Sequence, residues 1–158
     1  MKQIYKETST LYLSDSTISG AGKGLFAKKE FNKGDIIDYF DGDLLTYEES
    51  DFIEKTSSIE RGAYFIDREA TYEAIWDKKI KLDKPILDVY NSGCMAKMAN
   101  DAEGFTSTGK KNNASLSITK ISKKCYIYAL KKIRKDEEIL ISYGEDYWND
   151  IKKRLSEL

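Results

Sequence analysis

The stretch Asp-Glu-Glu-Ile-Leu-Ile-Ser-Tyr-Gly-Glu-Asp-Tyr-Trp, residues 136–148, carries the most informative pattern of the chain. Residues 139–142 have the β-branched and small character of a short strand, which ends at Tyr143 in front of a glycine. Tyr147 and Trp148 follow a turn later, so the three rings are expected to lie close together. Taken alone, this pattern favours an aromatic core cluster, and a functional site is the alternative.

Two neighbouring carboxylates precede this strand, at Glu137 and Glu138. They do not form a paired acid–base site, because adjacent residues of a strand point to opposite faces of the sheet.

A glycine-rich segment, Ser-Gly-Ala-Gly-Lys-Gly-Leu-Phe-Ala, covers residues 19–27. It fails the phosphate-loop pattern, since Thr17 stands where the first glycine belongs and Gly24 stands where Ser or Thr would bind magnesium. The residues that follow predict a strand, so no helix N-terminus is offered to a phosphate. The segment is either a plain turn or a loop whose missing side chains let the backbone approach a ligand closely.

A third segment, residues 87–102, is largely apolar but contains Asn100 and Asp101. These two side chains are candidates for polar anchoring of a ligand, and a simple turn is the alternative.

Composition excludes several classes of function. The chain has 158 residues with 41% hydrophobic side chains, which predicts one folded domain. Lys and Arg (26) nearly balance Asp and Glu (27), and a net charge of −1 argues against a nucleic-acid binder. The absence of histidine removes Ser–His and Cys–His nucleophiles and imidazole-bound zinc, so no metal is expected.

The sequence has no apolar run of about 18 residues and no apolar stretch after Met1, so neither a membrane span nor a secretory signal is expected. An intracellular location follows as an expectation, with Cys94 and Cys125 as reduced, buried thiols.

Turn residues alternate with short apolar segments over most of the chain, which predicts a mostly β, α+β fold with small helices. Thr46 followed by Glu49 is a capping box and predicts a helix start. Residues 63–88 are ambiguous. Apolar residues at near four-residue spacing from Tyr147 onward predict an amphipathic C-terminal helix. The predicted strands are residues 11–13, 25–27, 35–40, 64–66, 86–87, 115–119, 125–130 and 139–142.

Together, these segments resemble the SET-domain family of lysine methyltransferases in order and spacing, from about Leu13 to Trp148. The matching elements are Gly22–Ala27 with Phe31–Asp35 and Phe40–Gly42, then Leu87–Val89 with Gly93 and Ala96–Asn100, then Asn112–Ala114, and finally Ile133–Gly144.

The resemblance implies several small sheets, with the closing strand threaded through a loop near Asn100. It also implies S-adenosylmethionine as cofactor, S-adenosylhomocysteine as product and a lysine entering from the opposite face through a narrow channel. It assigns Tyr143 as the catalytic residue. The implied cofactor contacts are Gly22, Lys23, Gly24, Leu25, Tyr64, Asn100 and Asp101, and the implied channel residues are Phe40, Leu116, Ile141, Tyr147 and Trp148.

Four positions depart from the family pattern. Asp101 replaces a histidine whose main chain contacts adenine, Lys97 replaces an arginine, Lys23 replaces an aromatic residue, and Phe40 replaces a tyrosine. No cysteine cluster follows Trp148, so the C-terminal helix is expected to close the channel, as in the minimal, cysteine-free and short viral SET proteins. Phe40 and Ile141 offer no product-limiting hydroxyl, which predicts methylation beyond the first methyl group.

The expected organisation is a single SET domain over residues 1–158, with a core at about 11–149, an insert at about 45–86 and a helix at about 147–157. The expected partner is a basic protein or peptide, first of all a histone, with no direct contact to nucleic acid or membrane. The expected location is nuclear for a histone substrate and otherwise cytoplasmic. Two alternatives stay open, namely a SET-like binding module without turnover and a methyltransferase for non-histone lysines.

Overall fold

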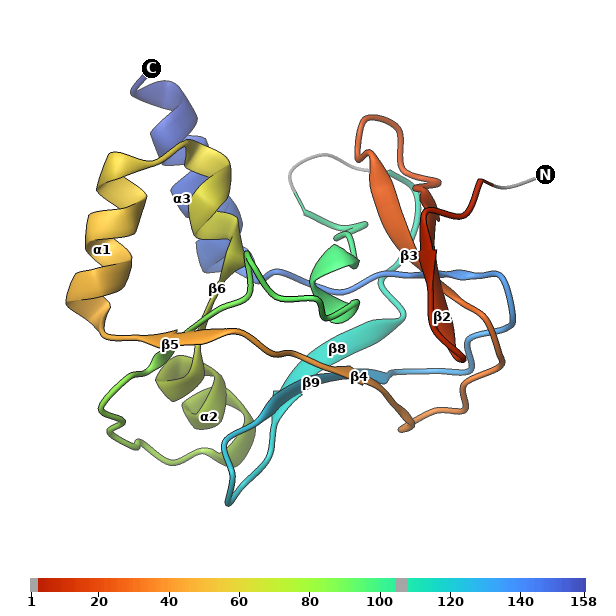
Figure 1. Cartoon of the computed structure of the whole chain (residues 1–158), viewed down its shortest axis with the longest axis horizontal. Helices are drawn as coiled ribbons and strands as arrows, with labels where there is room; N and C mark the ends of the chain where they lie inside the picture. The colour runs from red at the N-terminus through yellow and green to blue at the C-terminus, as the bar shows by residue number, and fades with distance from the viewer. Residues whose placement is uncertain (1–2, 105–107) are drawn as a thin grey trace.

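Three small antiparallel sheets form the framework of the protein in this computed structural model, which describes residues 3–104 and 108–158 (Figure 1). The sheets have the strand orders β1-β2-β3-β10, β4-β9-β8 and β5-β7-β6. The elements are β1 (Lys6–Glu7), β2 (Leu11–Asp15), β3 (Lys23–Ala27), β4 (Ile36–Tyr39), β5 (Asp43–Leu45), α1 (Tyr47–Thr56), the 3-10 helix η1 (Ile59–Tyr64), β6 (Phe65–Asp67), α2 (Arg68–Trp76), β7 (Ile86–Asp88), the 3-10 helix η2 (Ala96–Met98), β8 (Ala114–Ile118), β9 (Cys125–Ala129), β10 (Glu138–Ile139) and α3 (Glu145–Ser156).

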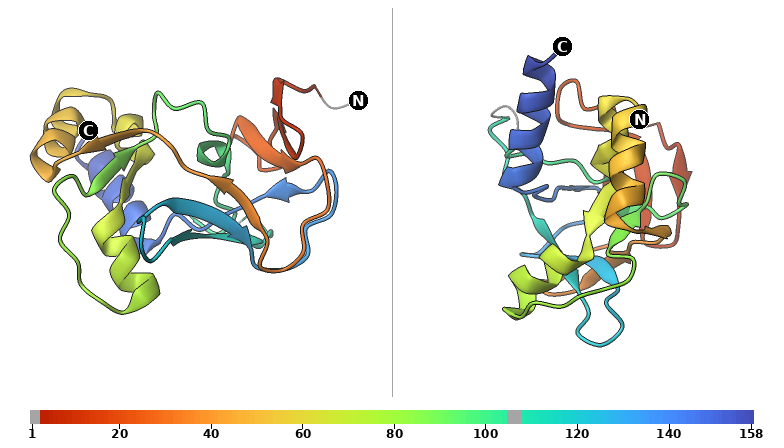
Figure 2. Two further views of the ribbon diagram at one scale, coloured as in Figure 1. Left: turned by 60° about the horizontal axis from the view of Figure 1, so that its bottom comes forward. Right: turned by 90° about the vertical axis from the view of Figure 1, so that its left-hand side faces the viewer.

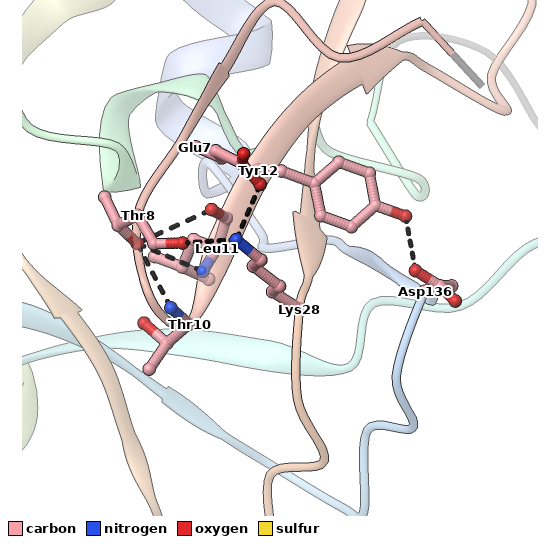
Figure 3. Close-up of polar contacts among 7 residues, drawn as sticks. All are labelled: Glu7, Thr8, Thr10, Leu11, Tyr12, Lys28 and Asp136. Atoms are coloured by element: carbon pink, nitrogen blue, oxygen red, sulfur yellow. Dashed lines mark hydrogen bonds and ion pairs between the residues drawn. The ribbon is translucent and has the colours of Figure 1, made fainter.

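Side-chain hydrogen bonds hold the first sheet together at its N-terminal edge (Figure 3). Thr8 Oγ1 accepts from the N–H groups of Thr10 and Leu11 in the β1–β2 turn, at 3.3 and 3.1 Å. Tyr12 stacks on Phe26 and donates its hydroxyl to Asp136 at 2.8 Å. Burial, followed by this hydrogen bond, raises the pKa of Tyr12 to about 12. The phenol therefore stays neutral and joins β2 to the turn before β10.

Buried and partly exposed side chains alternate along β9 of the second sheet, as in a strand with one face in the core. On β9, Cys125, Ile127 and Ala129 are buried, whereas Tyr126 and Tyr128 are partly exposed. The buried face belongs to the main core, which also contains residues of β3 and η2.

The insert between β5 and β7 contains one predicted helix and one that the sequence did not indicate. Thr46 caps α1 with the expected reciprocal bonds to Glu49. Helix α2 is capped by Asp67, but within it only Tyr72 is buried. An apolar stripe this narrow gives a weak helical periodicity, which explains why residues 63–88 were ambiguous. Tyr64, expected in a strand, ends η1 instead.

The closing segment lies between two stretches of chain that precede it. Ile141 N–H donates to the Asn100 carbonyl at 2.9 Å, and the N–H groups of Asn113 and Ala114 both donate to the Leu140 carbonyl at 3.0 Å. Both pairings are parallel single bridges, so the regular strand β10 is shorter than the predicted 139–142. The arrangement confirms the predicted fold of small sheets with a threaded closing strand.

The two cysteines are free thiols, with Cys125 buried and Cys94 partly exposed. Burial raises the pKa of Cys125 to about 12, so this thiol stays protonated. In the described part of the chain, no helix combines the length and apolar character that a bilayer span requires.

Gly42 provides a test of how tightly the insert joins the core. A Cβ at Gly42 would lie 2.1 Å from the carbonyl oxygen of Asp88, whereas a Cβ at Gly93 meets only the Lys6 ammonium at 4.0 Å. We expect Gly42→Ala to lower the free energy of unfolding by about 1–3 kcal/mol through overpacking, and Gly93→Ala to leave it nearly unchanged. Denaturant unfolding measures both, and equal effects would contradict this packing.

Candidate active site

One large cavity lies where the insert, the closing segment and the N-terminus of α3 meet. Its volume is about 960 Å³, which falls in the range of small-molecule sites. It is lined by Ala21, Lys23, Phe40, Ala63, Tyr64, Phe65, Ile66, Asp67, Ala70, Thr71, Val89, Ala96, Lys97, Met98, Ala99, Asn100, Leu116, Ile141, Ser142, Tyr143, Gly144, Glu145, Asp146 and Tyr147.

The glycine-rich segment is held against the cavity by the buried carboxylate of Glu138. Glu138 accepts from Ser16 Oγ at 2.7 Å and from the backbone N–H and hydroxyl of Thr17 at 2.8 and 2.6 Å. Asn100 Nδ2 donates to the Lys23 carbonyl at 3.0 Å and approaches Glu138 at 3.4 Å. A Cβ at Gly24 would lie 2.3 Å from the Glu138 carboxylate, so Gly24 permits this close approach.

Tyr143 is a partly buried side chain of the cavity wall that packs against the main core. Its hydroxyl donates to the Ala99 carbonyl at 2.5 Å. Its ring stacks on Trp148 and meets Tyr147 edge-on, at centroid distances of 5.8 and 5.1 Å. Burial, and after it the nearby phenol of Tyr147, raises the pKa of Tyr143 well above its ordinary value. The phenol is therefore neutral at physiological pH and acts as a hydrogen-bonding group rather than a base.

Asp101 joins the closing segment to α3. Its Oδ2 accepts from the Tyr143 N–H at 2.9 Å and from Trp148 Nε1 at 2.8 Å. Its Oδ1 accepts from the Glu103 N–H at 2.8 Å and from Asn112 Nδ2 at 3.0 Å. Burial alone would raise the pKa of Asp101, but these hydrogen bonds outweigh it and the pKa is lowered. An ionised carboxylate thus fixes Tyr143 and the first turn of α3.

The wall containing Tyr64 is anchored by an ion pair that is largely withdrawn from solvent. Arg61 donates to both oxygens of Asp88, at 2.9 and 2.5 Å, and its guanidinium lies 4.3 Å from the centre of the Tyr90 ring. Tyr90 in turn packs edge-on against Tyr64 at 5.2 Å. The paired geometry of an arginine and a carboxylate fixes orientation as well as distance, so this pair positions Tyr64.

Eight of the thirteen residues predicted for the site lie on the cavity wall, namely Lys23, Phe40, Tyr64, Asn100, Leu116, Ile141, Tyr143 and Tyr147. The other five are not part of the cavity lining. Gly22 and Gly24 shape the backbone around Lys23, Asp101 and Trp148 support Tyr143, and the Leu25 side chain is fully buried in the core. Lys23 points its ammonium toward the Tyr5 ring, 4.2 Å from its centre.

Three supporting groups were not recognised from sequence. The Ala99 carbonyl is a main-chain group and leaves no side-chain signal. Glu138 was recognised only as a neighbour of Glu137 on the opposite face of the strand, and its partners Ser16 and Thr17 lie more than 120 positions away. Arg61 is an isolated arginine in the ambiguous segment, and nothing in its spacing indicates Asp88 as its partner.

The lining is suited to a ligand with both cationic and polar parts. The Tyr64 and Tyr143 rings attract positive charge, Asn100 offers an amide, and Phe40, Leu116 and Ile141 form an apolar wall. These features fit S-adenosylmethionine, the cofactor implied by the sequence resemblance. In the described residues, no group of three or more His, Cys, Asp or Glu side chains is arranged to hold a metal ion.

Comparison with known proteins identifies this arrangement. The SET domain family model matches residues 22–144. A structure titled ctPRC2 in an autoinhibited conformation bound to S-adenosylmethionine matches with a TM-score of 0.66 and 20% identity, over 94% of this chain and 16% of that chain. The Neurospora SET domain protein DIM-5, titled a histone lysine methyltransferase, matches with a TM-score of 0.65 and 16% identity, over 85% of this chain and 52% of that chain. At these identities the likeness concerns the fold, and the chain spans about half or less of each structure. No curated protein matches the sequence.

Asp101→Asn tests the carboxylate that joins Tyr143 to α3. The amide replaces one accepting oxygen with a donor, so two N–H groups lose their partner, and we expect the free energy of unfolding to fall by about 1–3 kcal/mol. Because the pKa of Asp101 is lowered in the folded protein, its contribution is fully present above the ordinary Asp value of about 3.9 and is lost only as the pH falls through the folded value.

The measurement is denaturant unfolding of wild type and Asp101→Asn from neutral to acid pH, with the exposed Asp51→Asn as a matched control. The difference between wild type and Asp101→Asn should stay constant down to about pH 4. Its disappearance one or two pH units above that value would contradict the assignment.

Proposed function

Because this chain belongs to the SET-domain family, we propose that it is a protein lysine methyltransferase that uses S-adenosylmethionine. The observation that carries the proposal is the position of Tyr143, whose hydroxyl lies 2.5 Å from the Ala99 carbonyl on the wall of the large cavity. A partly buried, neutral phenol beside an apolar wall is suited to orient an amine rather than to remove protons from it.

The proposed cofactor site is the part of the cavity formed by Lys23, Tyr64 and Asn100. When bound, S-adenosylmethionine supplies a methyl group on a positively charged sulfur. Asn100 fixes the Lys23 backbone through its side-chain amide, and Tyr64 offers an aromatic face. Gly22, Gly24, Leu25 and Asp101 remain predicted cofactor contacts that would act through their backbone.

The proposed lysine channel is the apolar part of the same cavity, with Phe40, Leu116 and Ile141. A free lysine amine has a pKa of about 10.4 and is protonated at neutral pH. An apolar lining disfavours the charged form and lowers that pKa, so these side chains favour the neutral amine that methyl transfer requires.

Tyr143 then orients the neutral amine. Its hydroxyl hydrogen is engaged with the Ala99 carbonyl, which leaves its oxygen lone pairs free to accept from an amine N–H. An amine held in this way directs its own lone pair away from the phenol. Tyr147 packs against Tyr143 and Trp148 stacks on it, so the first turn of α3 keeps water from this end of the channel.

The proposed substrate is a basic protein segment. The three carboxylates of the cavity lining outnumber its two lysines, and this excess of negative charge favours a cationic peptide. The carboxylates are those of Asp67, Glu145 and Asp146, and the lysines are Lys23 and Lys97. A histone tail is the first substrate to test, since DIM-5 is a histone lysine methyltransferase, and a nuclear location would follow from it. Non-histone lysines remain the alternative substrate.

Radiolabelled methyl transfer to core histones and to a cell lysate tests the activity, with Tyr143→Phe beside wild type. We expect the variant to lose about 10²-fold in rate, because a reacting amine that is misplaced by about 1 Å costs that much. Tyr39→Phe, on the exposed face of the second sheet, is the matched control and should keep full activity. Thermal stabilisation by S-adenosylmethionine should persist in all three proteins, because ligand binding to the folded state stabilises it by mass action.

Equal labelling by wild type and Tyr143→Phe would contradict the assignment of Tyr143 as the catalytic residue. Stabilisation by the cofactor without labelling of any protein would instead favour the SET-like binding module.

Phe40 tests the size of the channel at the methyl-accepting end. Phe40 is 6% exposed and lines the cavity without a hydroxyl, so we expect mass spectrometry of the product to show more than one methyl group. Phe40→Tyr should shift the product toward one methyl group, because an added hydroxyl occupies or hydrates the space the next methyl needs. Phe52→Tyr, at a 68% exposed position, should change nothing. A wild-type product with a single methyl group at full conversion would contradict this prediction.

A further inference from the structure

Two segments far apart in sequence form one end of the molecule, opposite to α3. They are residues 73–84, which end α2 and follow it, and residues 119–124, which form the turn between β8 and β9 (Figures 1 and 2). Trp76 Nε1 donates to the Ile118 carbonyl at 2.9 Å. Arg68 joins the same two segments, with Nη1 donating to the Lys123 carbonyl at 3.4 Å and Nη2 to the Lys84 carbonyl at 2.6 Å.

This end, which we call the basic corner, carries an excess of positive charge, although the net charge of the whole chain is −1. The two segments contain seven lysines and three carboxylates in a chain whose net charge is −1. The carboxylates are Glu73, Asp77 and Asp83, and the lysines are Lys78, Lys79, Lys81, Lys84, Lys120, Lys123 and Lys124. All of the lysines except Lys123 are exposed. The described salt bridges involve none of the seven. The Lys123 ammonium donates to the Ile121 carbonyl at 3.2 Å, and the charges of the other six are exposed to solvent.

Exposed aromatic rings accompany these lysines. Trp76 is 41% exposed, and the Lys120 ammonium lies 5.4 Å from the centre of its ring. Tyr39 of β4 is 38% exposed, and the Lys124 ammonium lies 5.0 Å from its ring centre. Tyr39 also begins a row of rings on the outer face of the second sheet, with Tyr126 at 5.7 Å and Tyr128 at 6.2 Å from Tyr126.

We propose that the basic corner binds nucleic acid, with its lysines on the phosphate backbone and the Trp76 and Tyr39 rings against unpaired bases. Lysines alone would suit any polyanion, but flat exposed rings next to ammonium groups match the combination of stacking surface and positive charge found in single-strand binding sites. An anionic membrane is the weaker fit. The exposed aliphatic side chains of the basic corner are Ile121, at 88%, and Ile75, at 42%, and two such side chains make a poor membrane anchor.

Nucleic-acid binding at the basic corner departs from the expectation drawn from net charge, which argued against a nucleic-acid binder. Net charge describes the whole chain, whereas binding depends on the charge that one surface presents. The proposal concerns a surface outside the cavity and does not require methyl transfer.

Fluorescence anisotropy with labelled single-stranded RNA, single-stranded DNA and duplex DNA tests the proposal directly. The test variant combines Lys120→Gln, Lys123→Gln and Lys124→Gln. The matched control combines Lys33→Gln, Lys131→Gln and Lys135→Gln, which removes the same charge from exposed positions elsewhere. Unfolding curves of both variants establish that the fold is kept.

We expect wild type and control to bind single strands. The test variant should bind at least about tenfold more weakly, because each lost phosphate contact reduces the number of counterions released on binding. For the test variant, the slope of log Kd against the logarithm of the salt concentration should be smaller by about two to three. Bound single strands should quench tryptophan fluorescence in wild type, and Trp76→Phe should remove that quenching. Stronger binding to duplex than to single strands would overturn the stacking role of Trp76 and Tyr39.

Three outcomes would overturn the proposal. The first is the absence of binding at about 50 mM salt, where electrostatic contacts are strong. The second is equal weakening in the test and control variants, which would indicate unspecific charge attraction. The third is binding to vesicles containing anionic lipid with none to any nucleic acid.

Discussion

The position of the closing segment is the constraint on which the rest of the structure depends. Residues 138–141 lie between Asn100 and Asn113 and hydrogen-bond to both, through the Asn100 carbonyl and through the backbone and side chain of Asn113. The buried side chain of Asn113 accepts from the Leu140 N–H and donates to the Glu138 carbonyl, both at 2.9 Å. Buried polar groups are costly unless paired, so this register is the one in which both the amide and the strand are satisfied.

Both sides of the cavity follow from that register. On one side, Glu138 is brought against Gly24, Ser16 and Thr17, which fixes the glycine-rich segment. On the other side, the chain leaves the sheet so that Tyr143 reaches the Ala99 carbonyl and the Asp101 carboxylate. A shift of one residue would turn Glu138 away from its partners and move the phenol out of the cavity.

The sequence predicted those parts of the fold in which local chemistry and tertiary structure agree. The capping box at Thr46 and the strand predicted at residues 125–130 are each determined by near neighbours, and the resemblance to the SET-domain family supplied the threaded topology. Helix α2 was missed because it buries little besides Tyr72. The Arg61–Asp88 pair was missed because its partners lie 27 positions apart with no repeating pattern between them. For the same reason, the balanced composition could not indicate that lysines from residues 78–84 and 120–124 gather at one end.

Helix α2 relates the cavity to the basic corner. Its N-cap Asp67 and first-turn residues Ala70 and Thr71 line the cavity, while Trp76 ends the helix at the basic corner. Nine helical residues span about 13 Å at the usual rise per residue, so the two surfaces are separated by the length of one short helix. The two ends also differ in charge, with carboxylates near the cavity and lysines at the corner. The proposed protein substrate and the proposed nucleic-acid strand would therefore meet different parts of the same insert, so that binding of one would leave the side chains proposed to bind the other unoccupied.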